Sequence, residues 1–202
     1  SQGGPTGPPR PRRSLNPRMT AAARLSTINP TSIDDALVAE AGAALAEGKL
    51  VAIPTETVYG LGCNALEPDA IAGVFEAKGR PASDPLIVHV DGVAMADTLI
   101  EGGLPAVATW LATAVWPGPL TMVLPKTGIV PDAITSGGPT VGVRCPAHPV
   151  ARALITASGV PVAAPSANRF GRISPTTAAH VVEELGDRND LIVDAGSADH
   201  GV

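Results

Sequence analysis

The sequence predicts an α/β fold with a twisted, mixed open sheet flanked by helices, and three observations support this. Apolar runs of strand length alternate with longer segments whose apolar residues recur at helical spacing, and glycine or proline separates most of these segments. The strand–helix repetition is imperfect, which favours a mixed sheet over a fully parallel one. The chain is 45% apolar but has only five aromatic residues, so we expect a core of Val, Ile, Leu and Ala.

The N-terminal region is predicted to form a tail that precedes one domain. Residues 1–30 are rich in Gly, Pro, Arg and Ser, and we expect them to be disordered. This acid-free tail faintly resembles a transit peptide, and Met19 could be the natural start. A helix is predicted from Ser32, a good N-cap, to Gly48. A buried strand over 50–53 should follow and should open into a polar loop over 54–62.

The next helix and the loop after it carry two closely spaced cations. Pro68 at the first helical position and Gly79 as a stop predict a helix over 68–78. Lys78 and Arg80 lie at its end, on a loop that two prolines stiffen. They indicate either a site for an anionic ligand or an ordinary solvated helix end.

The strand over 86–90 is predicted to present a histidine beside that loop. Its alternation divides the residues between two faces, one with Leu86, Val88 and Val90 and the other with Ile87 and His89. Further helices are predicted near 93–100, 105–115 and 149–157. Further strands are predicted at 120–124, 140–144, 160–164 and 191–194.

Polar side chains follow two of the predicted strands. Thr55, Glu56 and Thr57 come after one, and Ser166 and Asn168 come after another. Open α/β sheets place ligands at the carboxyl ends of their strands. Ser174 and Pro175 are predicted to cap a helix that ends at Gly186, and a helix N-terminus favours phosphate. Ordinary turn chemistry and a plain capped helix are the alternatives to a binding site.

Charge is unevenly distributed along the chain. Five of the fourteen basic residues precede Asp34 and all nineteen acidic ones lie from Asp34 onward, so the first 33 residues carry +5 and the rest −10. An acidic body argues against broad nucleic-acid binding. Five of its nine basic residues fall in motif-like stretches, which suggests a small anionic ligand: Lys78, Arg80, Arg144, Arg169 and Arg172.

Several other classes of protein are disfavoured. No apolar run is long enough for a transmembrane helix, and two distant cysteines, Cys63 and Cys145, suggest no disulfide framework. Cys145 and His148 have the spacing of metal ligands but lack the further partners that zinc needs, so no protein metal site is predicted. Gly-x-Ser-x-Gly, Walker A and dinucleotide-binding sequences are absent from the chain.

Four motifs that occur in order resemble one family. They are Pro54-Thr-Glu-Thr-Val-Tyr-Gly-Leu-Gly62, Lys78-Gly-Arg-Pro81 with Pro85-Leu86 and His89-Val90, Thr140-Val-Gly-Val-Arg144 with Pro146, and Pro165-Ser-Ala-Asn168. Together they resemble the YrdC-like family, the threonylcarbamoyl-AMP synthases. The resemblance implies a sheet with a deep concave site, and a YrdC-like domain over residues 31–202.

The resemblance implies an enzyme that joins L-threonine, bicarbonate or CO2, and ATP. Its products would be L-threonylcarbamoyl-AMP and pyrophosphate, for N6-threonylcarbamoyladenosine modification of tRNA position 37. The implied ATP-binding residues are Lys78, Arg80, Asp84, Thr140, Ser166, Asn168 and Ser174. The implied L-threonine-binding residues are Thr55, Thr57, His89 and Arg144. His89, Arg144 and Lys78 would be catalytic, with His89 either a general base or only a substrate ligand, and Mg²⁺ would accompany ATP.

The sequence departs from the family pattern in two places. Asp84 stands where the family usually has asparagine, and its carboxylate would repel a triphosphate unless Mg²⁺ or Lys78 intervened. The chain stops at Gly201-Val202, where the family continues, so we expect a C-terminally truncated domain. The alternative functions are an RNA- or ribosome-binding module and a carbamoyl-transfer domain of the same fold. We expect a cytoplasmic protein with at most weak tRNA association, although organellar targeting by the tail stays open. The expected partner is the transferase complex that uses the product.

Overall fold

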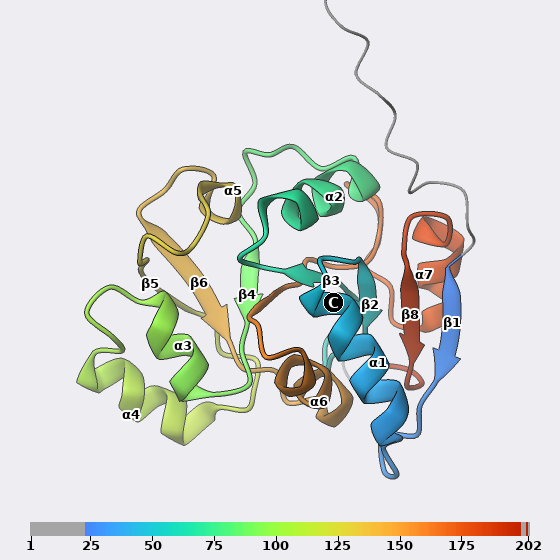
Figure 1. Ribbon diagram of the computed structural model, residues 1–202, viewed down its shortest axis with the longest axis horizontal. Coiled ribbons are helices and arrows are strands. Elements are labelled where there is room, and N and C mark those ends of the chain that lie inside the picture. Colours follow the sequence, from blue (N-terminus) through green and yellow to red (C-terminus); the bar gives the residue numbers. More distant parts are fainter. Residues whose placement is uncertain (1–22, 199–200, 202) are drawn as a thin grey trace, which may run out of the picture.

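The computed structural model describes residues 23–198 and residue 201, and within this part of the chain it confirms a mixed α/β fold (Figure 1). The strands are β1 (Arg24–Thr27), β2 (Val51–Ile53), β3 (Gly60–Asn64), β4 (Ile87–His89), β5 (Met122–Pro125), β6 (Thr140–Arg144), β7 (Val162–Ala163) and β8 (Leu191–Asp194). The helices are α1 (Asp35–Ala46), α2 (Pro68–Lys78), α3 (Val93–Leu99), α4 (Ala106–Val115), α5 (Asp132–Thr135), α6 (Pro149–Ser158) and α7 (Ala178–Leu185). No helix of the described residues is both long and apolar enough to cross a membrane.

The described strands form one sheet in the order β1-β8-β2-β3-β7-β4-β6-β5. β1 and β2 both pair parallel with β8, and β4 pairs parallel with β6. The other neighbours are antiparallel. The register of the parallel β4–β6 pair sets His89 beside Arg144. The sheet is therefore mixed, as the imperfect strand–helix repetition predicts.

Helices cover both faces of the sheet. Val51 and Ile53 of β2 pack in one apolar cluster with α1 and α6, whereas Ala52 between them packs in a second cluster with α2 and α7. Figure 1 shows α1 and α6 side by side in front of the sheet, with α7 behind β8. Strands buried on both faces consist of continuous apolar runs, which explains the composition of β2 and β8.

Two predicted helix starts are wrong. The first helix is capped by Asp34, whose carboxylate accepts from the N–H groups of Ala36 and Leu37, while Ser32 lies in a turn that its own N–H closes onto Asn29. The helix predicted at Ser174 begins at Ala178, capped by Thr177. Its expected first turn is extended instead, because the carbonyls of residues 175 and 176 accept from the backbone N–H groups of residues 59 and 198.

Two predicted irregular segments contain strands. Residues 24–27 of the supposed tail form β1, which pairs with β8, whereas residues 1–22, including Met19, lie outside the described residues. The loop predicted over 54–62 ends at residue 59, and β3 starts at residue 60. A Cβ on Gly62 would lie 3.0 Å from the carbonyl oxygen of Val51. The glycines therefore mark close contact between strands rather than a loop.

Candidate functional site

A cavity of about 250 Å³ lies over β4 and β6 and is bounded by the segments that follow β2, α2 and β7. It brings together six of the predicted site residues, namely Thr55, Thr57, Arg80, His89, Arg144 and Ser166. The apolar part of the lining includes Ile87 and Leu86 of the strand region and Ala164 after β7. Its volume lies just below the 300–1,000 Å³ of typical small-molecule sites, which suits an amino acid better than a larger ligand.

One end of the cavity is organised by an ion pair between Arg144 and Glu56. The Nη2 of Arg144 donates to Oε1 of Glu56, and the backbone N–H of Ala147 donates to Oε2 at 3.2 Å. Burial alone would raise the pKa of Glu56, but the hydrogen bond and charge of Arg144 and the backbone donors outweigh it and leave that pKa below 4.5. Glu56 therefore stays ionised at neutral pH.

His89 lies beside this pair as a neutral imidazole. Burial first, and the charge of Arg144 second, lower the pKa of His89 from 6.5 to about 4, against the opposing effect of Glu56. Such an imidazole carries one N–H and no positive charge at pH 7, so it suits hydrogen bonding better than taking a second proton from an ammonium group. Within the described residues, His89 Nδ1 and Arg144 Nε are buried without a hydrogen-bond partner. Buried polar atoms are rarely left so, which points to a polar ligand here.

The lowered pKa of His89 predicts a specific loss of stability in acid. Between pH 6.5 and pH 4 the unfolded state binds the His89 proton and the folded state does not, so stability falls as pH decreases through this window. His89→Gln should remove this component, which amounts to roughly 2–3 kcal/mol between pH 7.5 and pH 4.5. Urea unfolding at both pH values measures it. The exposed His180, changed to Gln, is the control, and an equal pH dependence of wild type and His89→Gln would contradict the prediction.

Thr55 and Thr57 form the wall beside the ion pair. The Thr55 hydroxyl donates to the carbonyl of Val58 at 2.6 Å and accepts from the N–H groups of Thr57 and Val58. Thr55 is buried, whereas Thr57 is half-buried and its hydroxyl lies 3.1 Å from that of Thr55. Thr55 therefore fixes the loop, and Thr57 is the better placed of the two to meet a ligand.

Lys78 anchors the loop that carries Ser166, which forms another part of the cavity wall. Its ammonium donates to the carbonyl of Asn168 at 2.6 Å and to the carbonyl of Ser166, and its side chain is buried. Burial first, and the charge of Arg80 second, lower the pKa of Lys78 to about 8, against the opposing effect of Glu184. Lys78 is not among the described residues that line the cavity. It contacts the loop that carries Ser166, which does line the cavity.

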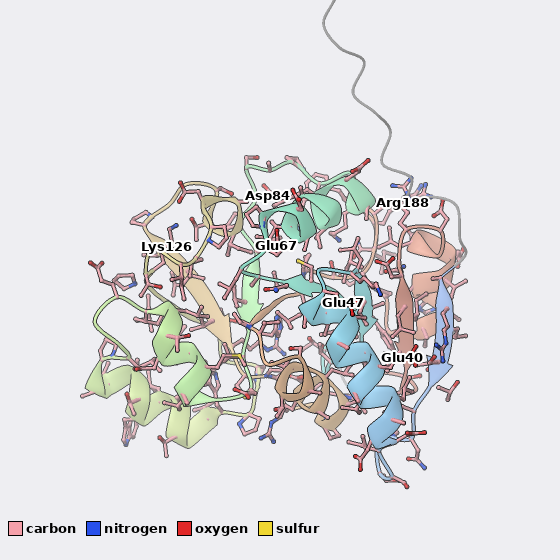
Figure 2. The ribbon with its side chains drawn as sticks, viewed as in Figure 1. Glu40, Glu47, Glu67, Asp84, Lys126 and Arg188 are labelled. Carbon is pink, nitrogen blue, oxygen red and sulfur yellow. The ribbon has the colours of Figure 1, made fainter. Side chains whose placement is uncertain are left out.

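Arg80 lines the cavity while its guanidinium contacts its own loop. It donates to the carbonyl of Pro85 at 3.2 Å and lies 3.7 Å from the carboxylate of Asp84. Asp84, labelled in Figure 2, therefore forms a loose ion pair with Arg80 at the surface. Asp84 is not among the described residues that line the cavity.

Three other predicted residues lie away from the cavity lining, as judged from the described chain. Thr140 is exposed and lies at the opposite end of β6 from Arg144. Asn168 is buried, and its amide donates at 2.8 Å to the carbonyls of Arg169 and Arg172, so it shapes the following loop. Ser174 is half-buried in the extended segment before α7. Their ATP contacts stay predictions.

Glu56 and Tyr59, which were not predicted as site residues, make buried side-chain contacts. The residues around Glu56 favoured ordinary turn chemistry over a binding site, and its partner Arg144 is 88 positions away. Tyr59 is fully buried, and its hydroxyl donates to the carbonyl of Gly196 at 2.6 Å and accepts from the N–H of Ala195.

Comparison with known proteins gives consistent matches. The Sua5/YciO/YrdC family model, described as "Telomere recombination", matches residues 43–202. A threonylcarbamoyl-AMP synthase of Pyrococcus abyssi is 53% identical over 156 residues, covering 77% of this chain and 46% of that protein. One of Bacillus subtilis is 48% identical over 172 residues, covering 85% and 49%. The crystal structure of P. abyssi Sua5 complexed with L-threonine superposes with a TM-score of 0.83 at 47% identity, covering 86% of this chain and 51% of that one.

The chain spans about half the length of these curated relatives.

Proposed function

Because the chain belongs to the Sua5/YciO/YrdC family, we propose that it synthesises L-threonylcarbamoyl-AMP from L-threonine, bicarbonate or CO2, and ATP. The observation that carries the proposal is that His89 and Arg144 line one cavity of amino-acid size, and that His89 Nδ1 and Arg144 Nε are, among the described residues, buried without a hydrogen-bond partner. A relative of this chain has been crystallised with L-threonine, and other relatives are named threonylcarbamoyl-AMP synthases.

The Arg144 end of the cavity is assigned to L-threonine. A guanidinium fixed by Glu56 offers its remaining N–H groups to the α-carboxylate, which arginine binds in a planar, two-point manner. His89 and Thr57 would bind the amino or hydroxyl group. With a pKa near 4, His89 would act as a neutral ligand, and the amine would lose its proton before it adds to CO2.

The Arg80 end is assigned to the phosphates of ATP. L-threonine and CO2 first form a carbamate, and one carbamate oxygen then attacks the α-phosphorus. The bond from that phosphorus to the β-bridging oxygen breaks, pyrophosphate leaves, and a mixed anhydride with AMP remains. Arg80 would stabilise the charge that builds on the phosphates, and Lys78 would hold Ser166 in place beside them.

Mg²⁺ is proposed to enter with ATP. In the described part of the chain, no group of three His, Cys, Asp or Glu side chains is placed to hold a metal ion. Phosphate oxygens and water would therefore provide its ligands, as is usual for nucleotide-bound Mg²⁺, and the ion would neutralise phosphate charge.

The mixed anhydride is reactive, so it requires an acceptor. We propose that a tRNA threonylcarbamoyl-transferase complex takes it to modify adenosine 37, in the cytoplasm and without stable tRNA binding by this chain. The −10 balance of residues 34–202 agrees with weak RNA association.

Calorimetric titration tests the proposed amino-acid site. L-Threonine should bind the chain, D-threonine should bind at least about tenfold more weakly because its carboxylate and amine exchange positions, and acetate should not compete. Equal affinity for both enantiomers would overturn this assignment.

A further inference from the structure

We propose that Glu56 is a positioning residue of this site: it fixes the guanidinium of Arg144 and thereby the carboxylate of the amino-acid substrate. The inference rests on the proposed function and deepens it. Thr55 and Thr57 on either side of Glu56 line the cavity, whereas Glu56, among the described residues, lies outside that lining. Glu56 therefore approaches Arg144 from behind the cavity.

The contacts of Glu56 hold it at two points. One carboxylate oxygen accepts from Arg144 at the end of β6, and the other accepts at 3.2 Å from the N–H of Ala147, three residues later. The side chain is only 6% exposed. The segment between β6 and α6 therefore holds the carboxylate, and the carboxylate holds the guanidinium.

Stability of the fold does not explain why this pair is charged. Removing two ions from water costs about as much as their attraction returns, and packed apolar side chains often replace such pairs without loss. A guanidinium that must present a planar fork to a ligand does require a fixed partner. The contacts of Arg144 agree with such a role. Its Nη2 donates to Glu56, while its Nε is buried and, within the described chain, has no hydrogen-bond partner.

The negative charge of Glu56 also suits a zwitterionic ligand. Glu56 and Arg144 together carry no net charge before a ligand binds, so the net-neutral zwitterion of an amino acid can enter without a large excess of positive charge behind its carboxylate. An uncompensated Arg144 would instead attract any small anion. We therefore expect Glu56 to affect selectivity as well as affinity.

The test is Glu56→Gln, which keeps the shape and one acceptor oxygen but removes the charge. L-Threonine affinity should fall roughly 10- to 100-fold, and the KM for L-threonine should rise more than kcat falls, because a charge-assisted hydrogen bond is lost. ATP affinity should change less than about twofold, since Arg80 and Ser166 are unaltered. Glu56→Asp, which retains the charge, should recover part of the affinity.

Glu40→Gln is the matched control. Glu40 on α1 also pairs its Oε1 with an arginine, Arg24 of β1, but at the surface and away from the cavity (Figure 2). The L-threonine affinity of the Glu40→Gln variant should equal that of the wild type.

A double-mutant cycle separates positioning from simple loss of stability. If Glu56 acts through Arg144, Glu56→Gln should weaken L-threonine binding no further in an Arg144→Gln background, in which both charges are gone and the fold is spared an unpaired buried ion. Additive losses, or equal losses of ATP and L-threonine affinity, would overturn the inference.

A measurement without substrate keeps the inference apart from the proposed function. The guanidinium ¹⁵N resonances of Arg144 should show slow rotation in the wild type and fast rotation in Glu56→Gln. Unchanged rotation would overturn the inference. Absence of L-threonine binding to a wild type with slow rotation would instead refute the proposed function and leave the positioning role of Glu56 supported.

Discussion

Arg144→Gln is expected to lower kcat/KM for L-threonine by roughly 100- to 1,000-fold, because two charge-assisted hydrogen bonds to the carboxylate are lost. The loss should appear mainly in the KM for L-threonine, with the KM for ATP changed little. The variant should also be less stable by about 3 kcal/mol, since Glu56 would remain buried without its partner. Steady-state kinetics at saturating ATP and urea unfolding measure the two effects.

Arg24→Gln provides the control for this substitution. It breaks the exposed Arg24–Glu40 pair, and such pairs contribute at most about 1 kcal/mol. Its kinetics should match the wild type. A comparable loss of L-threonine and ATP efficiency in Arg144→Gln would show a general distortion and contradict the assigned role.

Lys78→Met should have the second largest effect, this time on ATP. Methionine fills a similar volume but leaves the carbonyls of Ser166 and Asn168 without their ammonium donor. We expect the KM for ATP to rise roughly 10- to 100-fold, because the loop beside the phosphates loses its anchor and a positive charge disappears. With a pKa of about 8, Lys78 also loses its proton as pH rises, so in the wild type the KM for ATP should rise above pH 8, and this dependence should vanish in Lys78→Met.

Lys126→Met is the control for the loss of a lysine that caps a carbonyl. Lys126, labelled in Figure 2, donates to the carbonyl of Val130 at 2.7 Å and pairs with Asp132. The Lys126→Met variant should be less stable than the wild type, but its KM for ATP should be unchanged. Equal effects of the two substitutions on this KM would refute a specific role for Lys78.

Much of the fold follows from local chemistry. Gly79 at φ 60° ends α2, and Gly159 at φ 65° ends α6, where only glycine adopts this conformation without strain. The alternation predicted for 86–90 is confirmed, with Leu86 buried and Ile87 exposed by 40%. Local patterns failed where long-range pairing decides the structure. β1 forms because β8 offers a free edge, and β3 contains glycines because its neighbours are close.

Six of the eleven predicted site residues line the cavity, but the contacts between them were not predictable. The motifs placed His89 and Arg144 together, and the parallel register of β4 and β6 confirms that they are neighbours. The pairing of Glu56 with Arg144 could not be inferred, because loops distant in sequence meet only after the sheet forms. The same holds for Lys78, whose ammonium reaches carbonyls 88 and 90 residues away.

Pyrophosphate release with ATP and bicarbonate, with and without L-threonine, tests the central claim most directly. It should be measured on this chain and on a version extended to the length of its relatives, with the nucleotide product identified by mass spectrometry. We expect L-threonine-dependent release of pyrophosphate in stoichiometric amount with L-threonylcarbamoyl-AMP. Release that is independent of L-threonine, or no release from either version, would contradict it.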